Sequence, residues 1–294
     1  MEFLPAGPPV GRQGEKKGED MNSKTAKTGM SPWKIALLTL FAAMLLFPGR
    51  ASAKKSYTIY VNRKTNLVNV VDRHKRLLKS MYCSTGKHYS TIKGTYRTQS
   101  KMRWHALYHG VYGQYCTRIH GPYLFHSVPY TRVSKRAMQT REFNKLGRQA
   151  SHGCIRLSAA DARWIYKHCP VGTRVVIGEK RRLTPPVQKR LIVSTKKKTG
   201  WDPTDPSKSN PYKVSITLRK AFRKGVALGS DFDIPSALVF RSAFTRPAVL
   251  AAGARWEGNV DTSVPGIYLV KVAVRDPATR LITIKVFKIR VLPR

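Results

Sequence analysis

Short runs of alternating hydrophobic and polar residues dominate the chain from residue 57 onward, and such alternation is typical of β-strands. Residues 57–61 and 67–71 predict a hairpin joined by a polar turn, and residues 77–83 predict a third strand. Further strands are predicted at 94–98, 104–111, 114–119, 123–127 and 174–177. The pattern therefore predicts a mainly β domain built from many short strands.

One helix is predicted late in this domain, over about 159–169. Ser158 is a favourable N-cap, and Asp161 three residues later forms a variant of the capping box. Pro170 and Gly172 end the helix, because neither residue continues it well. Many short strands with one late helix predict a β-sandwich or barrel-like domain in which strand ends present the functional site.

The same pattern divides the chain into four parts. They are an N-terminal extension with a signal peptide (1–53), the first β domain (54–182), a linker rich in proline and lysine (183–211) and a second all-β domain (212–294). The second domain alternates clearly at its start, and its Asp-Thr-Ser-Val-Pro-Gly-Ile-Tyr segment, with Asp-Pro further on, resembles bacterial immunoglobulin-like modules. That resemblance implies a spacer or a wall-binding unit.

The N-terminal part has the features of a secretory signal peptide. Lys24, Lys27 and Lys34 precede an apolar run at 35–47, and Ala51-Ser52-Ala53 forms a cleavage site. We therefore expect export to the cell envelope, on the periplasmic or extracellular face, with cleavage near Ala53. An uncleaved N-terminal anchor is the alternative, although 13 positions are short for a membrane span. Met21 is the expected start of the protein, because a purine-rich stretch resembling a ribosome-binding site can encode residues 16–20, and Met1 is the alternative.

Charge is strongly unbalanced along the chain. The sequence has 55 Lys and Arg against 15 Asp and Glu, a formal charge of +40, and such an excess implies a polyanionic partner. Export argues against nucleic acid, and no nucleic-acid-binding module is recognised. We therefore expect anionic cell-wall polymers or a membrane surface as partners; a purely solubilising role is the alternative.

Residues 151–157, Ser-His-Gly-Cys-Ile-Arg-Leu, concentrate the candidate chemistry of the chain. Cys154 is the natural nucleophile, since a thiolate attacks carbonyl carbon well and a neighbouring cation lowers its pKa. Gly153 permits a tight turn, so that its N–H and that of Cys154 would point at a developing oxyanion. The predicted helix starts just beyond, and its dipole would favour a thiolate. His126, which ends an apolar strand-like run, is the candidate base.

A histidine followed by serine, and then Ser-His-Gly-Cys-hydrophobic-Arg, resembles the L,D-transpeptidase family, also called the YkuD domain. The resemblance runs from about residue 57 to residue 178. It implies that Cys154 is the nucleophile, that His126 is the base and that the Ser127 carbonyl orients the imidazole. The oxyanion and substrate-binding residues that it implies are Gly153, His152, Arg156, Ser127 and Ser151.

The resemblance implies an enzyme that acts on peptidoglycan stem peptides without a cofactor or a metal ion. Cys154 would attack the carbonyl of the diamino acid at the third stem position and release D-Ala. The thioester would then pass to an acceptor amine, forming a cross-link, or to water. The alternatives are an L,D-carboxypeptidase and a non-catalytic wall-binding protein. A zinc site of His126, His152 and Cys154 is disfavoured, because further ligands lack a clear spacing.

Two departures from the family pattern stand out. The gap between His126 and Cys154 is longer than the family's basic spacing, and residues 131–149 predict an inserted lid. Thr91-Ile92-Lys93-Gly94 stands where the family often has Thr-Pro-x-Gly. Neither departure touches the residues of the chemistry, but the lid leaves the substrate preference open.

Two further cysteines suggest a disulfide. Cys83 and Cys116 each lie in a β-like run, and export would supply oxidising conditions. We therefore expect a Cys83–Cys116 disulfide, with two separate buried thiols as the alternative.

Overall fold

The computed structural model describes residues 56–197 and 199–293. The expected signal peptide therefore lies outside the described residues. Within the part of the chain that is described, no helix is long and apolar enough to cross a membrane.

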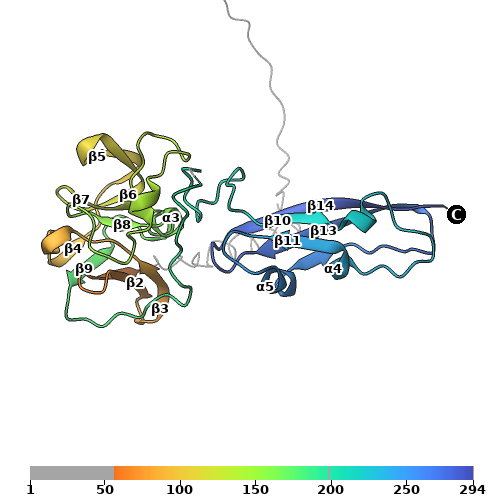
Figure 1. The fold of residues 1–294 in the computed structure, drawn as a ribbon. Coiled ribbons are helices and arrows are strands. Elements are labelled where there is room, and N and C mark those ends of the chain that lie inside the picture. The colour runs from red at the N-terminus through yellow and green to blue at the C-terminus, as the bar shows by residue number, and fades with distance from the viewer. Residues whose placement is uncertain (1–55, 198, 294) are drawn as a thin grey trace, which may run out of the picture. The chain divides into compact units, whose positions relative to one another are not determined.

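A five-stranded sheet forms one half of the first domain (Figure 1). The predicted hairpin is confirmed, because β1 and β2 pair in antiparallel register. β1 also pairs in parallel with β9, which returns from the far end of the domain. In the order β3-β2-β1-β9-β4 its strands are Leu77–Tyr82, Leu67–Asp72, Tyr57–Asn62, Arg174–Gly178 and Gly94–Arg97.

A four-stranded sheet forms the other half, in the order β5-β6-β7-β8. Its strands are Lys101–Leu107, Val111–His120, Tyr123–Ser127 and Ile155–Leu157. Strand β8 pairs in parallel with β7, so that His126 lies opposite Arg156. This pairing brings together the two motifs that are far apart in sequence. Short 3₁₀ turns η1 (Lys87–Tyr89) and η2 (Tyr108–Gly110) precede β4 and β6.

Helix α3 (Ala159–His168) confirms the single late helix and packs against β6 and β7. Its buried Ala162 and Ile165 share one core with Phe125 of β7 and Ile59 of β1. The first domain is thus two sheets and one helix around a common apolar cluster. Branched and aromatic side chains at alternate strand positions supply that cluster, which is the packing that the sequence pattern predicts.

Ser158 is the N-cap that was expected: its hydroxyl accepts from the Asp161 N–H. The reciprocal half of a capping box is missing, because the Asp161 carboxylate accepts from the Ser158 hydroxyl itself, at 2.9 Å. The other N–H groups of the first turn bind a segment about forty residues downstream. Ala159 N–H donates to Asp202 at 2.8 Å, and the next residue donates to Thr204 at 3.0 Å.

Residues 131–149 do not form the lid that the sequence suggested. This segment contains the short helix α2 (Thr140–Phe143) and buries its own apolar side chains in a second cluster. The partners come from residues 201–212, here called the strap, which lie in the range expected as a linker. The cluster contains Val128, Tyr130, Met138, Phe143, Leu146, Val193, Trp201 and Tyr212. The apolar side chains of residues 131–149 therefore pack in this cluster and do not cover the site.

Residues 214–291 have a third apolar cluster. They form a two-stranded sheet, β10-β11, and a three-stranded sheet, β12-β13-β14. The immunoglobulin-like resemblance of this part stays a prediction. The elements are β10 (Ser215–Leu218), η3 (Lys220–Phe222), α4 (Ile234–Ala237), β11 (Leu238–Arg241), α5 (Pro247–Ala252), β12 (Arg255–Glu257), β13 (Gly266–Arg275) and β14 (Ile282–Val291).

Candidate active site

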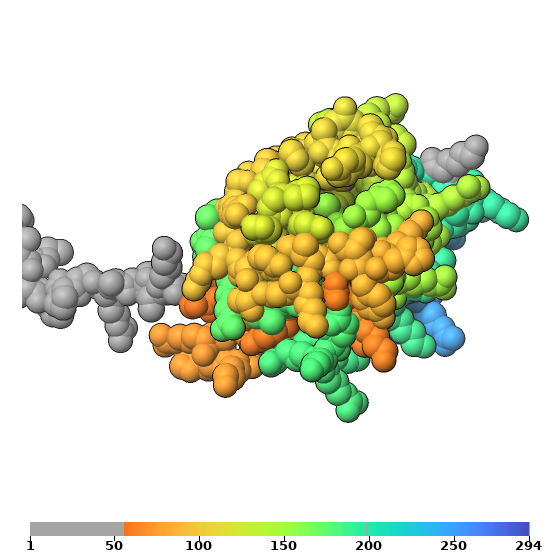
Figure 2. Space-filling model, turned by 90° about the vertical axis from the view of Figure 1, so that its left-hand side faces the viewer, coloured from red at the N-terminus to blue at the C-terminus, as the bar shows by residue number. Residues whose placement is uncertain are grey.

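A pocket of about 680 Å³ contains both Cys154 and His126. Its walls come from the end of β5 and η2, from the β6–β7 turn and from residues 151–156. Figure 2 looks onto the side of the first domain that carries residues of β5 and β6, drawn in yellow. The pocket therefore brings the expected nucleophile and base together, although 27 residues separate them in the sequence.

The turn that carries the thiol depends on a glycine. Gly153 has φ +141°, and a Cβ there would lie 2.8 Å from the Tyr123 ring and 3.4 Å from the Ser90 carbonyl. The Ser151 hydroxyl braces this turn: it accepts from Gly153 N–H at 3.1 Å and donates to the Cys154 carbonyl at 2.6 Å. Gly153 N–H is therefore already bound to Ser151, and the N–H of Cys154 is the other candidate donor to an oxyanion.

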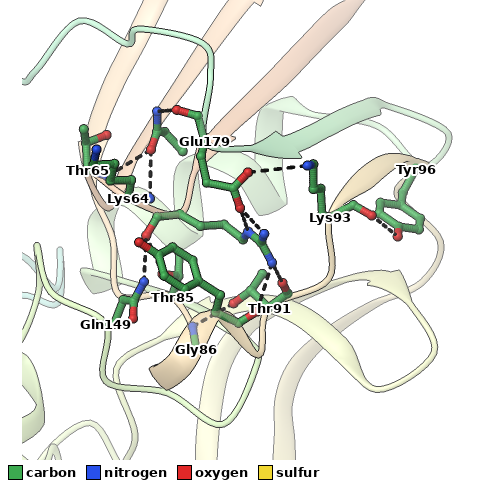
Figure 3. Close-up of polar contacts among 12 residues, drawn as sticks. Lys64, Thr65, Thr85, Gly86, Thr91, Lys93, Tyr96, Gln149 and Glu179 are labelled. Atoms are coloured by element: carbon green, nitrogen blue, oxygen red, sulfur yellow. Dashed lines mark hydrogen bonds and ion pairs between the residues drawn. The ribbon is translucent and has the colours of Figure 1, made fainter.

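A hydrogen-bond network holds the same turn from behind. Thr91 Oγ1 donates to the Gly153 carbonyl at 2.7 Å and accepts from Gly86 N–H at 2.7 Å. The Thr91 carbonyl accepts from the Arg63 guanidinium, which also binds the Glu179 carboxylate (Figure 3). Residues 91–94 depart from the family pattern only after Thr91. Thr91 itself still holds the turn at Gly153.

His126 is fully buried on β7. Its Nδ1–H donates to the Ser127 carbonyl, the contact that was expected to orient the ring, and this tautomer leaves Nε2 as an acceptor. Gly113 on β6 makes room for the imidazole, because a Cβ there would lie 2.9 Å from Nδ1. Burial and the nearby Arg156 charge lower the pKa of His126 to about 3. The base is therefore neutral at physiological pH.

Cys154 is a protonated thiol in this environment. Burial raises the pKa of Cys154, against the Leu124 N–H and the Arg156 and Arg118 charges, which all lower it. The neighbouring cations thus lower the pKa of Cys154 as expected, but desolvation is the larger effect and the pKa is raised overall. The first N–H groups of α3, whose dipole was expected to favour a thiolate, bind the strap. The Cys154 Sγ lies 3.5 Å from the Pro122 carbonyl.

Arg156 is nearly buried, and its guanidinium is hydrogen-bonded within the protein. It donates to Glu142 at 2.6 Å and to the Ala150 carbonyl at 3.1 Å. Burial lowers the pKa of Arg156, and the Glu142 carboxylate opposes that effect. The guanidinium lines the pocket but acts there chiefly through its charge on His126 and Cys154.

The part of the pocket wall formed by η2 was missed by the sequence analysis. His152 is exposed, and its ring centroid lies 5.0 Å from that of His109 in η2. Burial, followed by the His109 and Arg156 charges, lowers the pKa of His152. His109 and Gly110 both have positive φ, so the chain reverses there. The sequence predicted one strand over 104–111. Gly110 after His109 could have indicated a turn inside that range.

The expected Cys83–Cys116 disulfide is absent: both residues are free, buried thiols. Cys83 follows β3 of the five-stranded sheet, whereas Cys116 lies on β6 of the other sheet, where it pairs with Met102. Two apolar runs had been assumed to be neighbouring strands, and the order of strands in the two sheets places them apart.

Comparison with known proteins gives a family match for the first domain. Residues 56–177 match the family model of the YkuD L,D-transpeptidase catalytic domain. Over 58 residues the chain is 55% identical to the putative L,D-transpeptidase YciB of Bacillus subtilis (strain 168), an alignment that covers 20% of this chain and 29% of that protein.

Solved structures show weaker similarity. An L,D-transpeptidase from Mycobacterium smegmatis is 20% identical with a TM-score of 0.36, over 42% of this chain and 58% of that one. L,D-transpeptidase 1 from Mycobacterium tuberculosis is 19% identical with a TM-score of 0.33, over 42% and 62% of the two chains. This chain thus covers less than two thirds of each relative. The family match therefore concerns residues 56–177, and this part of the chain is similar to an L,D-transpeptidase (YkuD) catalytic domain.

Proposed function

We propose that this protein is an exported, cysteine-dependent L,D-transpeptidase that cross-links peptidoglycan stem peptides. The parallel pairing of β7 with β8 supports this proposal most directly, because it places a buried neutral imidazole and a thiol in one pocket. Neutral partners suit the chemistry, since an imidazole must be unprotonated to accept the thiol proton.

In the first half-reaction the Cys154 sulfur attacks the carbonyl carbon of the diamino acid at the third stem position. The thiol proton moves to Nε2 of His126, and the Cys154 N–H stabilises the oxyanion that forms. When the C–N bond breaks, His126 gives that proton to the leaving nitrogen. The products are D-Ala and a thioester on Cys154.

In the second half-reaction an acceptor amine attacks the thioester carbonyl. His126 takes a proton from the amine and returns it to the sulfur as the C–S bond breaks. The product is a new amide bond between two stems, and the thiol is regenerated. Attack by water instead would make the protein an L,D-carboxypeptidase, which is the second candidate. Both candidates use the same acyl-enzyme.

The test is mass spectrometry of the protein after incubation with a disaccharide-tetrapeptide. The wild-type protein should gain the mass of the acyl group and release D-Ala, and cross-linked dimers should accumulate. Cys154→Ala should show neither adduct nor dimer, whereas Cys169→Ala, a control at a buried thiol outside the pocket, should show both. Turnover by a folded Cys154→Ala protein would refute the assignment, and a wild-type protein without any adduct would favour a non-catalytic wall-binding role.

A further inference from the structure

Arg118 lies near the end of β6 and lines the pocket. Its guanidinium donates to the carbonyl of Gly121 in the β6–β7 turn. The next carbonyl along that turn, on Pro122, lies 3.5 Å from the Cys154 sulfur. The guanidinium and the nucleophile therefore contact neighbouring carbonyl groups of one turn, which places a positive charge a short distance from the sulfur.

The charges of the pocket are all of one sign. Its ionisable lining consists of arginine, histidine, tyrosine and cysteine side chains, without an Asp or Glu. Arg156 is neutralised by Glu142 at 2.6 Å. Among the described residues Arg118 forms no ion pair, and its guanidinium donates one hydrogen bond, to the Gly121 carbonyl, which leaves further N–H groups for a ligand.

We propose that Arg118 is a specificity-determining residue that binds the carboxylate of the leaving D-Ala in the acyl donor. The inference rests on the proposed function. In a tetrapeptide stem this carboxylate lies two bonds beyond the scissile nitrogen, and the sulfur attacks the carbonyl carbon on the other side of that nitrogen. A carboxylate so close to the reacting carbon comes within reach of a guanidinium beside the thiol, and the two groups match in charge and in planar geometry.

This contact would distinguish donor stems by the number of residues after the scissile bond. A donor that ends one residue after the scissile bond presents its carboxylate to Arg118. A donor that continues by another residue, or ends in an amide, presents an uncharged group at the same place. Arg118 therefore selects donors with a free terminal carboxylate at the fourth position.

The test compares a disaccharide-tetrapeptide with its C-terminal amide, using the rate constant of acyl-enzyme formation divided by KM for each. Wild-type protein should prefer the acid by about tenfold to a hundredfold, the usual range for a hydrogen-bonded contact between charged groups. Arg118→Gln should bring the ratio of acid to amide close to one, and Arg118→Lys should keep part of the preference. Arg132→Gln, at an exposed arginine outside the pocket, should leave the ratio unchanged.

The ratio separates substrate recognition from other roles of the arginine. Because the Arg118 charge also lowers the pKa of Cys154, the Gln variant should react more slowly with both donors. If the variant slows both donors equally, so that the ratio is unchanged, Arg118 does not bind the carboxylate and the proposal is overturned. A wild-type protein that acylates both donors at the same rate also overturns it, while the proposed function stands. Failure of the wild-type protein to acylate with either donor would count against the proposed function itself.

Discussion

Cys154 and His126 are both neutral because burial outweighs the nearby charges. Desolvation alone raises the pKa of the thiol and lowers that of the imidazole, and Arg156 strengthens the second effect while opposing the first. In the proposed reaction the proton leaves the sulfur during attack. The motifs were enough to single out both residues, and the structure lines one pocket with them. Their protonation states could not be predicted, because burial is a property of the fold.

The pH dependence of acylation tests this neutral pair. Since the pKa of His126 is lowered to about 3, the base stays unprotonated at every pH where the protein is ordinarily studied. The ratio kcat/KM for acyl-enzyme formation should therefore be flat from about pH 5 to pH 8, without the acid limb near 6.5 of an ordinary histidine. The profile is measured by stopped-time mass spectrometry. An acid limb between pH 6 and pH 7 would contradict the neutral base.

Thr91 offers a second test, because it holds the Gly153 carbonyl without touching the pocket. Thr91→Val removes both the donor to Gly153 and the acceptor for Gly86 N–H. We expect kcat for acylation to fall about tenfold to a hundredfold, because the sulfur loses its alignment, while KM changes little.

Two further variants control for a general loss of stability. Thr91→Ser keeps the hydroxyl and should restore most of the rate, and Thr95→Val changes an exposed threonine on β4 and should have no effect. A Thr91→Val protein with unchanged kcat would show that the turn is held by its other contacts, those of Ser151.

At the scale of elements, the parallel β7–β8 pairing and the packing of α3 position the site. The strands and the helix were predicted from alternation and capping residues, but the pairing joins segments that local patterns do not connect. The strap was read as part of a linker because it is rich in Pro and Asp. Those polar residues are buried because they bind backbone groups: Asp202 and Asn210 are hydrogen-bonded inside the protein.

Asp202 should be the most sensitive residue of the strap. Its two carboxylate oxygens accept from Ala159 N–H at 2.8 Å and from Thr204 N–H at 2.8 Å. Asp202→Asn replaces one acceptor with a donor, so one N–H group loses its partner. The free energy of unfolding should fall by about 1–3 kcal/mol, measured by urea denaturation followed by tryptophan fluorescence. Asp231→Asn, at an exposed position, is the control and should change it little.

The same pair of proteins gives a pH test with a definite sign. Burial raises the pKa of Asp202 from 3.8 to about 6, so the folded protein holds a proton that the unfolded chain releases. The stabilising contribution is therefore complete below about pH 4 and is lost as the pH rises through 6. Between pH 4.5 and pH 7 the wild-type protein should lose stability relative to Asp202→Asn. A difference that stays constant over this interval would show that Asp202 ionises normally.

At the scale of the whole molecule, sheets are present before and after the strap, as the alternation predicted, while the domain boundaries stay a prediction. Local sequence patterns do not indicate where one apolar cluster ends and the next begins. Tyr212 packs with Trp201 in the cluster beside α2, whereas Val214 belongs to the cluster of the later sheets. The side chains on either side of Lys213 thus point to different cores, and only tertiary contacts reveal that change.

This division predicts how the protein responds to truncation. A chain of residues 55–213 keeps Val193, Trp201 and Tyr212 in the second cluster, together with the Asp202 and Thr204 bonds to α3. It should unfold cooperatively and should form the acyl-enzyme at a rate close to that of the chain 55–294.

A chain that ends at residue 182 loses all of these contacts, each worth roughly 1–3 kcal/mol on burial or hydrogen bonding, and should unfold at a much lower temperature or fail to fold. Calorimetry and acylation by a tetrapeptide donor measure both properties. Equal melting temperatures for the two shortened chains would show that the strap adds no stability, and loss of acylation in a folded 55–213 chain would mean that the later sheets contribute to the site.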